Sequence, residues 1–334
     1  MVSGLMTRPK RREVLMLGAL SGALLGVASL PGPLGVLGFV ALVPLLIAID
    51  RGAAVVNAGL AGFLAGLLQF GIGFGFIPFA AVGGGPALLA VYLLGILMLA
   101  TGTAGIAATL AWTRCYSRAL PLLIAPGGWI ALELLRSQSW IGIPWNHLAY
   151  GLAEHPALIQ SASLVGLYGI SCWVASVNAG LVACRWLAPR HTAALAIALG
   201  IPLVPGLRTL PEAPAASLRV AAVQPDLSEQ RRHREEWFHP NLRHLLALTD
   251  QVIGERPDLL VWPESAYERD LAPGGDAFLS AIGSGFGTSF VTGAWRKPHP
   301  GSMLRRNAAL MVDREGNLVH AADKVHPVPI YERA

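Results

Sequence analysis

The sequence predicts a multi-span α-helical membrane domain followed by an α/β domain, and three observations support this fold class. First, the 334-residue chain is 54% hydrophobic and only 13% charged, whereas soluble domains have roughly 25% charged residues. Second, charged residues are sparse before about residue 208 and reach the density of a soluble domain after it. Third, strand and helix patterns alternate in the last third of the chain. We therefore expect a membrane domain at 1–207, a linker at 208–216 and an α/β domain at 217–334.

Seven apolar runs predict the membrane-spanning helices, at 14–30, 34–49, 53–80, 86–111, 119–135, 158–186 and 192–207. Most approach or exceed the ~20 residues that cross a bilayer, whereas the second, fifth and seventh are shorter. The basic stretch Lys10-Arg11-Arg12 precedes the first run, but no small-residue cleavage site leads into a polar mature protein. We therefore expect an uncleaved first span rather than a signal peptide.

The charged residues between these runs predict the orientation of the chain. Counted from a cytoplasmic start, the outer loops around 31–33 and 83–86 carry no charge at all. The loops on the cytoplasmic side contain Arg51, Arg114, Arg118, Arg185 and Arg190. Because Lys and Arg accumulate on the cytoplasmic side, we expect a multi-pass protein of the bacterial cytoplasmic (inner) membrane. Its N-terminus would be cytoplasmic and its α/β domain would lie on the outer face.

Composition argues against several functional classes. The net charge of +5 is not gathered into a basic stripe interleaved with aromatics, so nucleic-acid binding is not supported. The three cysteines, Cys115, Cys172 and Cys184, have spacings that fit neither a disulfide framework nor a metal site. We predict no metal and no cofactor, and we interpret the cysteines as small core residues.

Small residues recur regularly in the first span. Gly18, Gly22 and Gly26 fall at four-residue intervals and leave one helix face without side chains. In lipid such a face favours close helix packing, so we expect it to contact a neighbouring span.

The loop at 136–156 combines aromatic and polar residues. Aromatics with a polar edge settle at the headgroup level, so Trp145 and Tyr150 could serve as interface anchors. Alternatively, they bind a lipid or a membrane-tethered substrate. Glu133 lies near the same end of its span, and a membrane-embedded acid needs a functional or structural reason. Arg136, three residues later, is one candidate partner.

Strands and helices alternate beyond the linker. The predicted strands lie at 218–224, 259–262 and 289–294, the helices at 228–253 and 276–287, and a hairpin at 307–312 and 317–321. Strands separated by a long helix are typical of a layered α/β domain.

The stretch Val261-Trp262-Pro263-Glu264-Ser265-Ala266 is the centre of this domain. Pro263 ends a short apolar strand because it lacks a backbone donor. Glu264 then emerges at the strand's carboxyl end, where desolvation can tune a carboxylate as a general base. Alternatively, Pro263 and Glu264 simply open the next helix, since both suit a first turn.

A second candidate follows the hairpin. The stretch Asp323-Lys324-Val325-His326-Pro327-Val328-Pro329 contains two prolines, which predict a shaped, semi-rigid loop. A lysine held by such a loop can pair with Glu264 and face a developing oxyanion. The alternative is a solvated lysine at the end of a strand.

Together, these segments resemble the apolipoprotein N-acyltransferases, membrane enzymes with a nitrilase-like (carbon–nitrogen hydrolase) domain. The individual motifs are weak, but their order and spacing over most of the chain are specific. They are the multi-span block and the segments 142–145, 167–171, 223–226, 262–266, 307–310 and 324–329. The resemblance implies a four-layer α-β-β-α sandwich, of which 217–334 is an incomplete part.

The resemblance also implies a Glu-Lys-Cys triad. Glu264 matches the general base, Lys324 the residue that stabilises the tetrahedral intermediate, and Glu332 a further acid of the active site. The implied reaction is ping-pong: a phospholipid acyl chain forms a cysteine thioester and then passes to the diacylglyceryl-cysteine of a prolipoprotein. The implied partners are therefore a phospholipid donor, a diacylglyceryl-prolipoprotein acceptor and membrane lipids. Candidate substrate-binding residues are Trp145, Tyr150 and His326.

The resemblance places the nucleophilic cysteine beyond Ala334. Cys115, Cys172 and Cys184 all precede the α/β domain and do not match it. We therefore expect no acyl transfer by the chain as given. Two other interpretations remain open, namely a non-catalytic conjugal-transfer or envelope protein with the same domain, and a membrane-tethered amidase.

Overall fold

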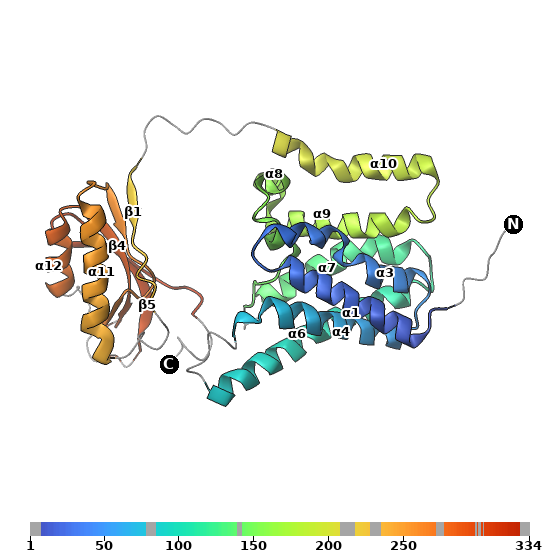
Figure 1. Ribbon diagram of the computed structural model, residues 1–334, viewed down its shortest axis with the longest axis horizontal. Helices are drawn as coiled ribbons and strands as arrows, with labels where there is room; N and C mark the ends of the chain where they lie inside the picture. Colours follow the sequence, from blue (N-terminus) through green and yellow to red (C-terminus); the bar gives the residue numbers. More distant parts are fainter. Residues whose placement is uncertain are drawn as a thin grey trace. The chain divides into compact units, whose positions relative to one another are not determined.

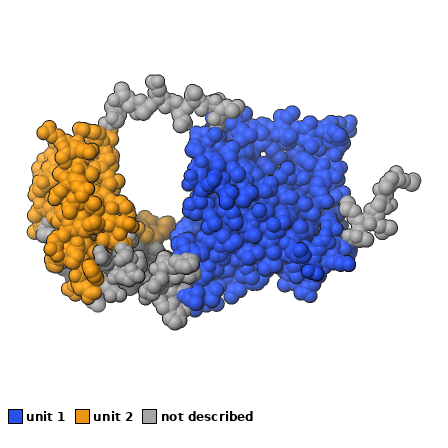
Figure 2. Space-filling model, in the orientation of Figure 1, with its two compact units in different colours: residues 1–210 blue, residues 211–334 orange. Residues whose placement is uncertain are grey.

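The computed structural model describes residues 8–77, 85–138, 142–207, 218–227, 235–271, 277–297, 299, 302 and 304–327. The chain forms two compact units, Met1–Leu210 and Pro211–Ala334, shown in blue and orange in Figure 2. Among described residues, the first unit is helical and the second combines a sheet with helices (Figure 1). The predicted fold class, a helical membrane domain followed by an α/β domain, is confirmed.

Five segments of the described chain are long and apolar enough to cross a membrane. They are Pro33–Asp50, Val55–Gly73, Leu89–Thr113, Leu120–Gln138 and Ala162–Ala183. The first comprises η1 (Pro33–Leu37), α2 (Gly38–Ala41) and α3 (Val43–Asp50), and the others belong to α4 (Val55–Gly73), α6 (Gly85–Thr113), α7 (Leu120–Gln138) and α9 (Ala162–Ala183). Shorter elements, η2 (Leu148–Leu152) and α8 (Pro156–Ile159), connect α7 to α9.

The first and seventh predicted spans are not among these five segments. The first corresponds to α1 (Arg11–Ala28), whose first turn is charged through Arg11, Arg12 and Glu13. The seventh corresponds to α10 (Pro189–Gly200), which has only 12 residues and continues into η3 (Ile201–Leu207). By length and composition, the described chain therefore supports five of the seven predicted spans.

The glycine face of α1 packs directly on α4. A Cβ added at Gly18 would lie 2.5 Å from the carbonyl oxygen of Ala61, and one at Gly22 would lie 2.4 Å from that of Ala65. Neither position can hold a larger side chain without moving backbone. The predicted close contact of this face with a neighbouring span is confirmed, as is its physical reason, the approach of two helix backbones.

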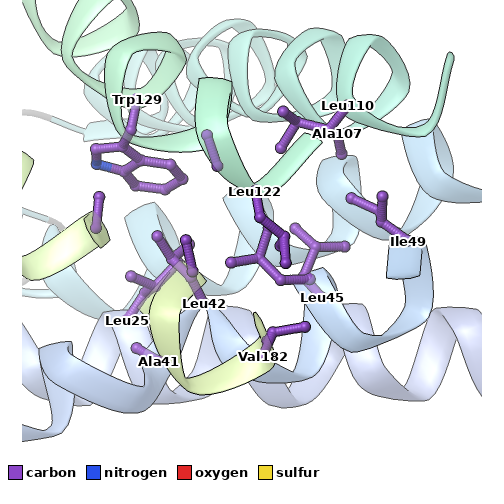
Figure 3. Packing of buried hydrophobic residues seen from close by; sticks show 14 of the residues in the cluster. Leu25, Ala41, Leu42, Leu45, Ile49, Ala107, Leu110, Leu122, Trp129 and Val182 are labelled. Carbon is purple, nitrogen blue, oxygen red and sulfur yellow. The ribbon is translucent and has the colours of Figure 1, made fainter. Parts of the chain in front are cut away.

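The core of the membrane unit forms between α1, α3, α4, α6, α7 and α9. Figure 3 shows Leu25, Leu45, Leu122 and Val182 converging there from different helices, together with Trp129. All are nearly inaccessible to solvent. Because lipid tails are as apolar as leucine, this packing works through dispersion and shape rather than through exclusion of water.

Polar side chains satisfy the backbone where the second predicted span breaks between α2 and α3. Asn178 of α9, fully buried, accepts a hydrogen bond from the Leu42 amide at 2.8 Å and donates to the Gly38 carbonyl at 2.8 Å. Ser21 of α1 accepts from the Leu45 amide at 2.9 Å. Backbone groups freed at membrane depth need such partners, so the break depends on residues distant in sequence.

The α/β unit contains one mixed sheet of six strands in the order β1-β2-β4-β5-β6, with β3 also paired to β4. The strands are β1 (Val220–Ala222), β2 (Leu259–Val261), β3 (Tyr267–Leu271), β4 (Ser289–Arg296), β5 (Arg306–Val312) and β6 (Leu318–Asp323). The first four are parallel, and β5 and β6 form the predicted antiparallel hairpin. Of these strands, β3 is the one that the sequence did not predict.

Helices cover one face of this sheet. They are α11 (Phe238–Ile253), which follows the short η4 (Glu235–Trp237), and α12 (Ala277–Phe286), and Figure 1 shows α11 and α12 on the same side. Phe290 and Ala294 of β4 and Leu310 of β5 are buried in one cluster with these helices, whereas Met311 on the opposite face is 39% exposed. Among described residues, the unit thus comprises one helical layer and one sheet of the expected four-layer sandwich.

Candidate functional site

Glu264 lies in an elbow between β2 and β3. Both strands pair with the same edge of β4, because Val261 pairs with Val291 and Tyr267 with Ala294. Between them the chain leaves the edge and returns to it. The alternative that Pro263 and Glu264 open a helix is wrong, since a turn at Glu264 is followed by a strand. Glu264 therefore emerges at the carboxyl end of a parallel strand.

Backbone contacts fix the elbow on β4. The Pro263 carbonyl accepts hydrogen bonds from the amides of Ala266 and Gly293, each at 3.2 Å. Ser265 takes a left-handed conformation, with φ of 55°. A Cβ at Gly293 would lie 2.3 Å from the Ser265 nitrogen and 2.7 Å from the Glu264 Cα. Because Gly293 has no side chain, it leaves room for the elbow to pack against β4. The sequence did not predict this role.

Lys324 and Asn307 both contact the Glu264 carboxylate. The Lys324 Nζ lies 3.2 Å from Glu264 Oε1, and the Asn307 Nδ2 donates to the same oxygen at 2.5 Å. The Lys324 amide donates to the Asn307 carbonyl at 2.8 Å, which holds the start of the lysine loop against β5. The structure therefore brings together Glu264 and Lys324, the two residues singled out in the sequence, and adds Asn307.

This cluster is open to solvent within its unit. The side chains of Glu264 and Lys324 are 65% and 34% exposed, so the expected desolvation of Glu264 is not found among described residues. Asn307 is only 6% exposed and anchors the cluster to the sheet. The signal that could have identified Asn307 is a lone amide at the start of the apolar strand Asn307-Ala308-Ala309-Leu310.

The remaining soluble-domain candidates have different positions. His326 is exposed, two residues after Lys324, and Glu332 lies outside the described residues. The described part of the chain contains no group of three or more His, Cys, Asp or Glu that could hold a metal ion. Cys115 is exposed, whereas Cys172 and Cys184 are half-buried in the membrane unit.

In the membrane unit, Trp145 and Tyr150 present their rings to the surface. Trp145 is 52% exposed and packs edge-on against Phe74, with ring centroids 5.7 Å apart. Tyr150 is 46% exposed and stacks on His147 at 5.1 Å. Each ring therefore packs against a neighbouring aromatic ring and is about half exposed in the described part of the chain, where another molecule can contact it.

A buried polar network lies beneath this loop. Glu133, 1% exposed, accepts hydrogen bonds at its Oε1 from the Trp129 indole at 3.1 Å and from the Leu148 amide at 2.9 Å. Arg136 donates to the Asn146 carbonyl at 3.3 Å. Glu133 and Arg136 of α7 thus both form hydrogen bonds with the loop. This structural role accounts for the presence of an acid within a membrane span.

His147 completes this network. Ser137 donates its hydroxyl proton to the Glu133 carbonyl at 2.7 Å, so His147 Nε2, 2.9 Å away, is the donor toward Ser137. Burial, with the nearby Arg136 charge, lowers the pKa of His147 from 6.5 to about 4. The ring is consequently neutral at physiological pH, with its one proton on Nε2.

Known proteins resemble this chain along most of its length. A family model described as the apolipoprotein N-acyltransferase N-terminal domain matches residues 21–180. The apolipoprotein N-acyltransferase of Rhizobium rhizogenes is 30% identical over 95% of this chain and 65% of its own length. That of Brucella suis biovar 1 is 32% identical over 94% and 64%, and that of Allorhizobium ampelinum is 33% identical over 75% and 48%. The chain is similar to apolipoprotein N-acyltransferases over most of its own length.

The chain spans between about half and two-thirds of the length of these apolipoprotein N-acyltransferases. The matched N-terminal domain extends from within α1 to within α9 and includes the loop of Trp145 and Tyr150. The similarity to these bacterial proteins, with the five apolar spans, indicates a multi-pass bacterial membrane protein. It favours the acyltransferase interpretation over the conjugal-transfer and amidase alternatives.

Proposed function

We propose that this protein serves the N-acylation of bacterial lipoproteins, in which a phospholipid acyl chain passes through a cysteine thioester to the α-amino group of a diacylglyceryl-cysteine. The observation that carries the proposal is the contact of Glu264 with both Lys324 and Asn307 at the carboxyl end of β2. The names of the relatives support the substrate class.

The chemistry assigns a role to each group. Glu264 takes the proton of the thiol, whose unperturbed pKa is ~8.5, and the thiolate attacks the ester carbonyl of the phospholipid. The Lys324 ammonium stabilises the oxyanion that forms, and the lysophospholipid leaves with the proton held by Glu264. In the second half, Glu264 takes a proton from the attacking amine, and the thiol is regenerated. Asn307 orients the carboxylate throughout.

The exposure of the Glu264 carboxylate fits this scheme. The nucleophilic thiol must approach from outside the described residues, and the 65% exposed side chain is accessible to it. We assign Glu332 as a further acid of this site and His326, two residues after Lys324, as a substrate contact. Trp145 and Tyr150 are the proposed contacts with the lipid substrates, because their rings are half exposed yet held in place. The proposed orientation has a cytoplasmic N-terminus and the α/β unit on the outer face of the inner membrane.

The test is thioester formation in a version of the protein that carries the family's nucleophilic cysteine, with radiolabelled phospholipid as donor. We expect Glu264→Gln to lower the rate by about 10³-fold, within the range of general-base catalysis. The matched control is Glu315→Gln, which removes an exposed acid from the turn between β5 and β6. Unchanged thioester formation in Glu264→Gln would exclude this glutamate as the base.

A further inference from the structure

A cluster of arginines at the start of α7, opposite the end that carries the Trp145 loop, takes no part in the proposed reaction. Its centre is Asp50, which ends α3 and is 1% exposed. Arg118 binds both carboxylate oxygens of Asp50, at 2.8 and 2.9 Å, and Arg185 lies 3.9 Å from one of them. The Arg114 Nε donates to the Asp50 carbonyl at 3.1 Å. This clamp of Asp50 with its three arginines joins the end of α3 to the segments that follow α6 and α9 and to the segment that precedes α7.

Beside the clamp lies a pocket of about 570 Å³ whose lining includes Arg8, Arg51 and Arg114. The carboxylate of Asp50 is already bound by Arg118, so it offers the pocket little negative charge. Arg51 contacts Glu13. The five arginines of the clamp and pocket therefore face two carboxylates, which leaves a clear excess of positive charge.

Exposed aromatic residues beside the pocket indicate that it lies at the depth of the lipid headgroups. Trp112, in the last turn of α6, and Tyr116, three residues after α6 ends, are 53% and 69% exposed and pack edge-on with centroids 5.3 Å apart. Exposed Trp and Tyr at the end of a membrane span are typical of the membrane–water interface. Cys115, between them in sequence, lines the pocket itself. The guanidinium groups are therefore at the level where phospholipid phosphates lie.

We propose that this pocket binds the phosphate of an anionic phospholipid, with Arg8 and Arg114 as its principal ligands. A guanidinium presents parallel N–H donors that match two phosphate oxygens, and basic pockets between membrane helices suit anionic headgroups. The Nε of Arg114 is oriented by the Asp50 carbonyl, which fixes the plane of its guanidinium. The site stands on the membrane unit alone, so it does not depend on the role of Glu264.

The exposed thiol of Cys115 provides a direct readout, because a lipid in the pocket would shield it. The whole chain is placed in nanodiscs of phosphatidylcholine, with or without phosphatidylglycerol, and alkylation of Cys115 by N-ethylmaleimide is followed by peptide mass spectrometry. We expect phosphatidylglycerol to slow alkylation at least about threefold, the effect of a ligand present at twice its Kd. Inorganic phosphate added to phosphatidylcholine nanodiscs should leave the rate unchanged.

Variants separate the pocket from the general surface charge of the bilayer. In Arg8→Gln/Arg114→Gln, phosphatidylglycerol should no longer protect Cys115, whereas Arg190→Gln, which removes an exposed arginine outside the pocket, should retain protection. Arg8→Gln alone, an exposed position, should give partial loss and guards against misfolding of the double variant. Protection that persists in the double variant overturns the proposal. Equal protection by inorganic phosphate overturns the assignment to a lipid.

Discussion

Glu133 of the membrane unit and Glu264 of the α/β unit are both carboxylates that accept hydrogen bonds, yet their surroundings are opposite. Glu133 is 1% exposed and receives the Trp129 indole and the Leu148 amide. The Glu264 side chain is 65% exposed and faces Lys324 and Asn307. The first carboxylate stabilises a loop, because its donors would otherwise be buried and unsatisfied. The second is accessible, so its interactions can be exchanged during a reaction.

The sharpest test of this contrast is Glu133→Leu. Leucine has a similar size but leaves the Trp129 and Leu148 donors buried without an acceptor, so we expect a loss of about 3 kcal/mol in the free energy of unfolding. Thermal unfolding of the detergent-solubilised chain measures it. Glu133→Gln, whose side-chain oxygen can still accept, should cost clearly less. An unchanged unfolding midpoint in Glu133→Leu would show that the Glu133 carboxylate does not stabilise the loop.

The buried His147, which belongs to the same network as Glu133, predicts that the stability of the protein depends on pH. The pKa of His147 falls from 6.5 to about 4 in the folded protein. As pH decreases through this interval, the unfolded chain takes up a proton that the folded chain does not. Stability is therefore complete above about pH 6.5 and decreases toward pH 4, by up to about 3 kcal/mol. Unfolding midpoints of the wild type and of His147→Gln, compared across this range, isolate the histidine. Parallel curves for the two proteins would refute the prediction.

In the α/β unit, the geometry of the elbow should be the sensitive feature. Gly293→Ala places a methyl group against the Ser265 nitrogen and the Glu264 Cα, so the elbow must move. We expect a cost of about 2 kcal/mol in stability, as for overpacked positions, and loss of thioester formation in the protein that carries the nucleophile. The control is Gly254→Ala, where an added Cβ meets no atom within 4 Å. Full activity in Gly293→Ala would show that the position of Glu264 tolerates displacement.

The sequence identified Glu264 and Lys324 because their signals are local: an apolar strand ended by proline, and a proline-rich loop after a hairpin. Asn307 and Gly293 escaped prediction because their roles depend on the register of β4 with β2, β3 and β5, which joins distant segments. The strand β3 was missed because its sequence, Tyr-Glu-Arg-Asp-Leu, contains no apolar run. Likewise, the break between α2 and α3 depends on Asn178, 136 residues away from Leu42.

The smallest expected effect on stability belongs to Lys324→Met. The pair with Glu264 is partly solvated, and ion pairs of this kind contribute less than about 1 kcal/mol after screening. Asn307 would still hold the carboxylate, so the unfolding midpoint of the whole chain should change little. Thioester formation should nevertheless fall by about 10²-fold or more, since the oxyanion loses its positive charge. A variant that loses stability in proportion to activity would instead make Lys324 a structural residue, and Glu264 would then resemble Glu133 more than their exposures indicate.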